Sequence, residues 1–161
     1  MGANESLPTA YRGVEVSELP VRAVLNRSAG RRVAMDLTIN PYRGCEFGCR
    51  YCYARYTHRF LEHHDPAEFE RWLYAKVTAP EKLAAELARM EIAGRSLAIG
   101  TATDPYQPIE RQLRITRGIL QALCGCRGAT ITLLTKSDLI TRDTDLYLKL
   151  AERHELSLGF T

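Results

Sequence analysis

Apolar residues recur along the chain with two spacings, and together they predict strands that alternate with helices. Short apolar runs rich in β-branched residues predict strands at residues 33–40, 96–103, 129–137 and 155–161. Apolar residues three or four positions apart predict helices at residues 78–94, 116–124 and 142–154. The segment 72–77 reads either as a further strand or as the continuation of a helix that begins near Asp65 and Pro66.

Polar residues mark where the predicted helices begin. Thr78 and Glu81 form a capping box with Pro80 just inside the helix, and Thr116 is the expected N-cap of the next helix. Gly94 is expected to end the first helix. The apolar side chains expected to face the core are Leu83, Leu87, Met90, Ile119, Leu120, Leu123, Leu146 and Leu150.

Strands that alternate with helices at this spacing predict an α/β fold built from βαβ units on a parallel sheet. In such sheets the chemistry gathers at the carboxyl ends of the strands, here the loops after Ile39, Gly100 and Leu134. We expect residues 33–161 to form this core and residues 1–32 to form an extended N-terminal arm. Because the last predicted strand has nothing to cover its edge, we expect the chain to be part of a longer protein or to pair with elements from elsewhere.

The composition is that of an ordinary globular protein. Of the 161 residues, 45% are hydrophobic and 25% are charged, and no apolar run approaches the roughly 18 residues that a membrane-spanning helix needs. The first residues also lack the charged and then apolar layout of a signal peptide. We therefore expect a cytoplasmic protein, in which clustered cysteines bind metal or do redox work more often than they form disulfides.

Three of the five cysteines lie within eight residues, where Cys45, Cys49 and Cys52 form a C-x3-C-x2-C motif. Thiolates are soft ligands that select iron–sulfur clusters, zinc or cuprous copper. A structural zinc site needs four ligands, and the other cysteines, Cys124 and Cys126, are expected at the opposite edge of the sheet. Three thiolates without a fourth leave one coordination position open, as in a catalytic metal centre.

Positive charge gathers around these cysteines. Between residues 41 and 60 the charged residues are Arg43, Arg50, Arg55, Arg59 and Glu46, which together equal the whole net charge of +3. The arginines are either solvated or paired to nearby acids, or they offset the thiolate charge and favour an anionic ligand such as the phosphates of nucleic acid.

The cysteine motif and two later segments resemble one enzyme family. The stretches NPYRGCEFGCRYCYAR (40–55), IGTATDPYQPIE (99–110) and LLTKSDLITRD (133–143) are similar to the radical S-adenosylmethionine (SAM) superfamily, and to its branch related to spore photoproduct lyase, the DNA-repair-photolyase-like proteins. The resemblance covers residues 37–161. It implies a partial (β/α)6 barrel of the TIM type, truncated in this chain after about four β/α units.

The resemblance implies that Cys45, Cys49 and Cys52 hold a [4Fe-4S] cluster whose open iron binds the amino and carboxylate groups of SAM. One electron, from a donor such as flavodoxin or ferredoxin, would cleave the sulfonium to a 5′-deoxyadenosyl radical that takes hydrogen from the substrate. Tyr51 is expected to lie against the adenine. The substrate is unknown, with nucleic acid as one candidate, and no catalytic residue is assigned.

Polar residues follow the other two strand ends. Thr101, Thr103 and Asp104 match the family segment that contacts the methionine end of SAM, although Asp104 would also fit a turn in which it caps its own backbone. Lys136 is expected to neutralise the SAM carboxylate or a substrate phosphate, and Ser137 to reach the ribose, unless both are merely solvated.

Two further points bear on function. Spore photoproduct lyase uses a cysteine near the second strand as hydrogen donor, and SLAIGTATDPYQ (96–107) contains none, so the lyase reaction does not follow from the motif alone. The thiolates could also serve a non-catalytic iron–sulfur or zinc-binding module. The histidines that follow the cysteines, His58, His63 and His64, are expected on a helix surface rather than as metal ligands.

Overall fold

Parallel strands form the larger of two sheets in the computed structural model, which describes residues 10–11, 13–28 and 35–161. The strand order is β3-β4-β7-β8-β9, with β3 antiparallel to β4 and all other neighbours parallel. Their bounds are β3 Asn26–Arg27, β4 Leu37–Ile39, β7 Ser96–Ile99, β8 Thr130–Thr135 and β9 Glu155–Phe160. The predicted parallel α/β sheet is confirmed.

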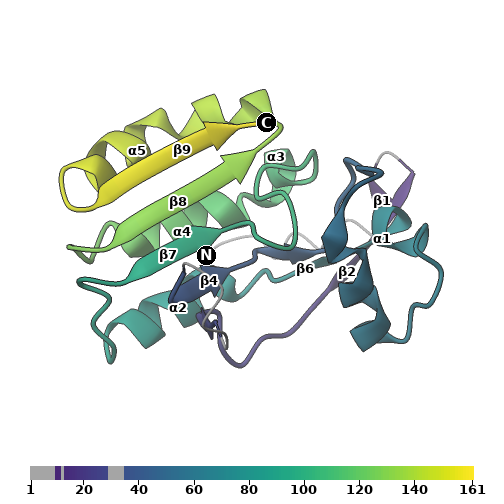
Figure 1. Ribbon diagram of the computed structural model, residues 1–161, viewed down its shortest axis with the longest axis horizontal. Coiled ribbons are helices and arrows are strands. Elements are labelled where there is room, and N and C mark those ends of the chain that lie inside the picture. Colours follow the sequence, from purple (N-terminus) through teal and green to yellow (C-terminus); the bar gives the residue numbers. More distant parts are fainter. Residues whose placement is uncertain (1–9, 12, 29–34) are drawn as a thin grey trace, which may run out of the picture.

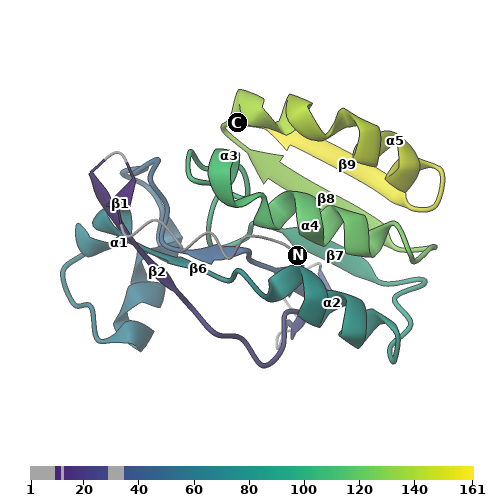
Figure 2. The same cartoon turned by 180° about the vertical axis from the view of Figure 1, so that it is seen from behind.

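Three helices cover one face of this larger sheet (Figures 1 and 2): α2 (Ala79–Leu87), α4 (Ile115–Leu123) and α5 (Thr144–Ala151). Most side chains expected to face the core are buried, namely Leu83, Ile119, Leu120, Leu123, Leu146 and Leu150. Leu87 and Met90 are only partly buried against the same core, because α2 ends at Leu87 and the chain then leaves the sheet.

A second, smaller sheet has the order β1-β2-β6-β5. Its strands are β1 (Ala10–Tyr11), β2 (Val14–Glu18), β6 (Trp72–Ala75) and β5 (Tyr42–Arg43). The ambiguous segment 72–77 thus begins as a strand, which directly follows the short helix α1 (Glu68–Arg71). Between β5 and α1 the chain forms the 3-10 helix η1 (Tyr53–Leu61).

The segment expected to be an extended N-terminal arm lies partly outside the described residues, which lack 1–9, 12 and 29–34. Its described part forms β1, β2 and β3, and β2 pairs in parallel with β6. Val16 and Val24 from this segment are 4% and 2% exposed and belong to the main hydrophobic cluster. Residues 13–28 therefore contribute to the core.

One predicted N-cap is in place and the other is wrong. Thr78 is the N-cap residue of α2, with Pro80 just inside the helix, but its side chain makes no capping hydrogen bond, since its backbone is not in the extended conformation that such a bond needs. Thr116 lies inside α4, because the chain reverses at Arg114, with φ of 53°, and the helix begins at Ile115. The carboxylate of Glu110, from the short helix α3 (Glu110–Leu113), instead accepts the Thr116 N–H at 3.0 Å.

No helix in the described part of the chain combines the length and apolar character that crossing a membrane requires.

Candidate functional site

Eight of the nine predicted site residues line one cavity of about 350 Å³ at the carboxyl ends of the parallel strands. The cysteine loop, residues 44–52, contributes thiols and one aromatic ring, and the loops after β7 and β8 contribute polar groups. These residues are Cys45, Cys49, Cys52, Tyr51, Thr101, Thr103, Asp104 and Lys136. Apolar groups such as Phe47, Ala54 and Leu134 complete the wall.

The three thiols of the cysteine loop differ in exposure. Cys45 is buried, and Cys49 and Cys52 are half-buried. Burial raises the pKa of the Cys45 thiol to about 12. Metals bind thiolates, so binding at Cys45 would release a proton. Among the residues described by the structure, no three His, Cys, Asp or Glu side chains are grouped so as to hold a single metal ion, so the three thiols could share only a larger group such as a cluster.

Hydrogen bonds fasten the cysteine loop to the segment that follows β7. The backbone N–H of Glu46 donates to the Gln107 side chain at 3.0 Å, and the Glu46 carboxylate accepts the Ile109 N–H at 2.8 Å. The hydroxyl of Thr103 donates to the Gly44 carbonyl at 2.6 Å. Hydrogen bonds between segments some sixty residues apart in the chain therefore fix the cysteine loop against the segment after β7.

Gly44 lets the cysteine loop lie close against β6. Its φ of 86° falls in the left-handed region that favours glycine, and a Cβ there would lie 2.5 Å from the Trp72 carbonyl oxygen. The neighbouring Cys45 N–H donates to the Phe69 carbonyl at 3.0 Å. Any other residue at position 44 would push the first thiol away from its place.

Asp104 joins the two strand-end loops. Its Oδ1 accepts the Tyr106 N–H at 2.8 Å, so the predicted turn capped by its own side chain is present. The same carboxylate accepts the Thr135 hydroxyl at 2.6 Å and the Lys136 N–H at 2.8 Å. Burial raises the pKa of Asp104 against the opposing effect of these hydrogen bonds. The side chain lines the cavity, but its principal contacts fix the loop after β8.

Tyr51 and Lys136 meet across the mouth of the cavity. The Lys136 ammonium donates to the Tyr51 hydroxyl at 3.0 Å and lies 5.6 Å from the centre of the ring. The hydrogen bond to Tyr51 raises the pKa of Lys136. Tyr51 is otherwise 81% exposed, which leaves its ring free to cover a bound ligand.

The remaining predicted residues have local partners. Thr101 accepts a hydrogen bond from the Asn40 amide at 3.1 Å, and the Tyr53 hydroxyl donates to its carbonyl. Ser137 does not line the cavity: its hydroxyl accepts the Leu139 N–H at 3.2 Å and caps the 3-10 helix η2 (Asp138–Asp143).

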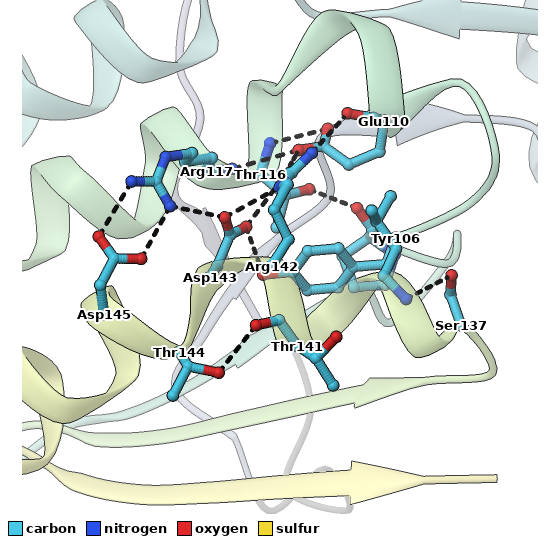
Figure 3. Close-up of polar contacts among 12 residues, drawn as sticks. Tyr106, Glu110, Thr116, Arg117, Ser137, Thr141, Arg142, Asp143, Thr144 and Asp145 are labelled. Carbon is cyan, nitrogen blue, oxygen red and sulfur yellow. Dashed lines mark hydrogen bonds and ion pairs between the residues drawn. The ribbon is translucent and has the colours of Figure 1, made fainter.

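A partly buried network of charges joins α3, α4, η2 and α5 (Figure 3). Glu110 and Asp143 are completely buried, and Arg142 forms ion pairs with both at 2.8 Å. Arg117 pairs with Asp143 at 2.7 Å and with Asp145 at 2.9 Å. Every charge in this group has an opposite partner, and the network ties η2 to α3 and to the start of α4. Elements beside the cavity are thereby held in fixed positions.

A comparison with protein-family models decides which family these residues belong to. Residues 39–160 match the radical SAM superfamily, a span that includes the cysteine loop and both strand-end loops. The chain belongs to the radical SAM superfamily. Members of this superfamily are enzymes, and membership implies a [4Fe-4S] cluster and SAM as cofactors.

Several curated proteins are similar to this radical SAM chain. The uncharacterized proteins Rv2578c of Mycobacterium tuberculosis and Mb2609c of Mycobacterium bovis are each 32% identical over 150 residues, 92% of this chain and 44% of theirs. The uncharacterized protein MJ0683 of Methanocaldococcus jannaschii is 33% identical over 123 residues, 76% of this chain and 42% of its own. The chain thus spans less than half the length of these relatives. No solved structure matches it.

The residues of this radical SAM chain fit an iron–sulfur cluster. Three soft thiol donors on one short loop line a single cavity, whose wall is largely apolar. An apolar shell of this kind restricts solvent around a cluster. Cys45, Cys49 and Cys52 would be the ligands.

Three of the four arginines near the cysteines, Arg50, Arg55 and Arg59, divide into two groups. Arg55 is tied down by Glu70 and by hydrogen bonds to the Pro66 and Cys49 carbonyls at 2.8 and 3.1 Å. Arg50 and Arg59 are exposed. The interpretation of pairing to nearby acids therefore holds for Arg55 and not for the exposed pair.

The expectation that the histidines lie on a helix surface is wrong for His58. This residue is 1% exposed, and its Nε2 hydrogen-bonds to the Trp72 carbonyl at 2.9 Å. It packs against Phe69 and Tyr74, and burial lowers its pKa. His63 is half-buried and contacts the Tyr74 hydroxyl at 2.5 Å. His64 is exposed.

Sequence reasoning missed residues that shape this radical SAM cavity. Asn40 holds the loop after β7 by accepting the Ala102 N–H at 2.7 Å. Gln107 contacts the Gly44 carbonyl and the Thr103 hydroxyl at 3.4 and 3.2 Å. The position of Asn40 directly after β4 was a usable signal, because it is itself a strand end. Gln107 carried no such signal.

Proposed function

We propose that this chain carries the cluster- and SAM-binding part of a radical SAM enzyme in the branch related to spore photoproduct lyase. The observation that supports this most directly is the common cavity of the C-x3-C-x2-C thiols and the ends of β7 and β8. We infer that the open parallel sheet is part of a partial (β/α)6 barrel. Its four parallel strands and three covering helices would be completed by the remainder of a longer protein.

The residues around the cavity take distinct roles in this proposal. The three thiolates hold the [4Fe-4S] cluster, which with SAM supplies reductive cleavage to a 5′-deoxyadenosyl radical. Thr101 and Thr103 present oxygens toward the methionine end of SAM, and Lys136 balances its carboxylate. Tyr51 closes over the adenine. Asp104 is a positioning residue, because its carboxylate holds the Lys136 backbone.

Anaerobic reconstitution tests the proposal. The 161-residue chain is expected to bind about four irons, to change its spectrum when SAM is added and to form 5′-deoxyadenosine after reduction. Cys49→Ala should lose the iron, because one of only three thiolate ligands is removed. The matched control is Cys124→Ala, because Cys124 does not line the cavity. This variant should retain the iron content of the wild type.

Three outcomes separate the alternatives. Zinc occupancy with no response to SAM would assign the thiolates to a non-catalytic module. Iron binding and a SAM response without 5′-deoxyadenosine would place turnover in the longer protein, and an extended protein should then restore it. Equal iron content in Cys49→Ala and the wild type would rule out the cysteine loop as the cluster site.

We further propose a nucleic-acid substrate and a small one-electron donor such as flavodoxin or ferredoxin. Exposed aromatic rings follow the cysteine loop along η1: Tyr53, Tyr56 and Phe60 are 67%, 53% and 71% exposed. Their ring centres are 6.5 and 6.1 Å apart in sequence order. Bases stack on such rings, and the exposed Arg50 and Arg59 would meet phosphates.

Binding of a single-stranded DNA oligonucleotide tests the substrate class. Affinity should fall steeply with salt, and the Arg50→Gln, Arg59→Gln double variant should show a salt slope reduced by up to about two. Arg153→Gln, which changes an exposed arginine after α5, is the control. Equal slopes for all three proteins would exclude this surface as a phosphate-binding face.

A further inference from the structure

A second cavity, of about 180 Å³, lies where the two sheets meet. Asn26 and Thr38 of the larger sheet form one side. Arg43 of β5 and Lys76, which directly follows β6, form the other side, and Phe60 of η1 closes an end. None of these residues lines the cavity of the cysteine loop.

Among the residues that the structure describes, the positive charge in this cavity has no acidic partner. No carboxylate lines it, and none of the ion pairs among the described residues includes Arg43 or Lys76. Lys76 is half-buried, and burial together with the nearby Arg43 lowers its pKa to about 8. Two neighbouring cations that lose solvent without an acid raise the free energy of the folded chain.

The backbone fixes both cations in this unfavourable position. Arg43 pairs with Tyr74 in the β5–β6 ladder, and the Lys76 N–H donates to the Pro41 carbonyl at 3.1 Å. Thr38, Asn26 and Asn40 also line the wall, and the amide groups of the two asparagines already bond to protein atoms. Such an arrangement suits an oxyanion, which accepts hydrogen bonds from both cations.

We propose that Arg43 and Lys76 form a binding site for an oxyanion, a phosphate or carboxylate group of the substrate. The assignment to substrate rests on the proposed function, since Ala102 lines both this cavity and the cavity of the cysteine loop. Asn40 strengthens the connection, because it lines the second cavity and holds Thr101 of the first. A substrate anchored here lies directly beside the SAM site.

Calorimetric titration of the reconstituted chain with inorganic phosphate, at pH 7 and constant ionic strength, tests the site. At this pH Lys76 is mostly protonated, because its pKa is about 8. Lys76→Met keeps the length of the side chain and removes its charge, and it should weaken phosphate binding about tenfold or more. Lys149→Met, which changes an exposed lysine on α5, should bind phosphate as the wild type does.

A thermal melt without phosphate separates loss of binding from loss of fold. Lys76→Met should melt at the wild-type temperature or above it, because the variant no longer desolvates an unpaired charge. Phosphate should raise the melting temperature of the wild type and of Lys149→Met more than that of Lys76→Met. If Lys76→Met melts lower and phosphate stabilises all three proteins equally, the lysine is structural and the proposal is wrong.

Two more arms locate the anion and identify its chemistry. Loss of phosphate binding in Lys136→Met but not in Lys76→Met would place the anion in the SAM cavity and overturn the proposal. A titration with acetate in place of phosphate identifies the class of anion. If acetate binds with an affinity comparable to that of phosphate, the substrate group is a carboxylate. If acetate binds much more weakly, the group is a phosphate ester. None of these titrations requires SAM cleavage. A chain that binds phosphate at Lys76 but does not cleave SAM would therefore contradict the proposed function and still support this site.

Discussion

Two pairs of basic residues occupy similar depths in this chain but differ in what surrounds them. Arg117 and Arg142 are about one quarter and one fifth exposed, and they face the buried carboxylates of Glu110 and Asp143. Arg43 and Lys76 are also half-buried, yet no acid lines their cavity. The first pair is satisfied by the protein alone.

The comparison distinguishes a structural charge network from a site with capacity for a ligand. A buried cation with its carboxylate in place is costly to disturb but has little left to offer a ligand. A cation without an acid weakens the fold and gains most from an incoming anion. Mutations in the two places should therefore change stability in opposite directions.

Arg142→Met should produce the largest change. It leaves Glu110 completely buried without its ion pair, so the free energy of unfolding should fall by about 3–5 kcal/mol. Urea unfolding measures this loss. The exposed control Arg153→Met should change it by no more than about 0.5 kcal/mol. A loss below about 1 kcal/mol in Arg142→Met would mean that the network is not essential to the fold.

Acid should weaken the contribution of Asp143 to the same network. Burial alone would raise the pKa of Asp143, but hydrogen bonds from Arg142 and Arg117 outweigh it and hold this pKa below its usual 3.8. A lowered pKa in the folded state means that the stabilisation is complete above about pH 4 and is lost as the pH falls through the folded-state value.

Unfolding in urea between pH 5 and pH 2.5 measures that loss. Asp143→Asn should show a shallower decline than the wild type over this range, although it starts from a lower stability. The exposed control Asp138→Asn should retain the wild-type slope. Parallel curves for all three proteins would contradict the assigned pKa direction.

Lys76→Met should give the smallest change and the opposite sign. Removing a desolvated charge with no acidic partner should raise the free energy of unfolding by about 1 kcal/mol in phosphate-free buffer. Urea unfolding of this variant beside Lys149→Met provides the measurement. If the free energy of unfolding instead falls by more than about 1 kcal/mol, Lys76 stabilises the fold as Arg142 does, and the comparison is wrong.

Local patterns were sufficient to predict the parallel strands of the larger sheet, but not β3, whose residues were assigned to the extended arm. β4, β7, β8 and β9 follow from short apolar runs, and the three covering helices follow from the spacing of their buried side chains. The cysteine motif and the strand-end rule also predicted most of the cavity, because parallel strands bring their carboxyl ends to one edge.

Contacts between distant segments were not predictable in this way. Glu110 and Arg142 are 32 positions apart and carry no periodic signal of their pairing. β2 joins β6 through a register that no local pattern specifies. The predicted N-cap at Thr116 is wrong for the same reason: the carboxylate of Glu110, from another helix, accepts the hydrogen bond of the Thr116 N–H. The count of charged residues near the cysteines likewise did not predict that Arg55 has an acidic partner and that Arg43 lines a cavity without one.

Ala102 stands as the common wall of both cavities. If each cavity is filled as proposed, the anionic group of the substrate binds in a cavity that adjoins the SAM cavity at this residue. Molecules whose negative group lies near the carbon that loses hydrogen would then fit the chain better than molecules in which the two are remote.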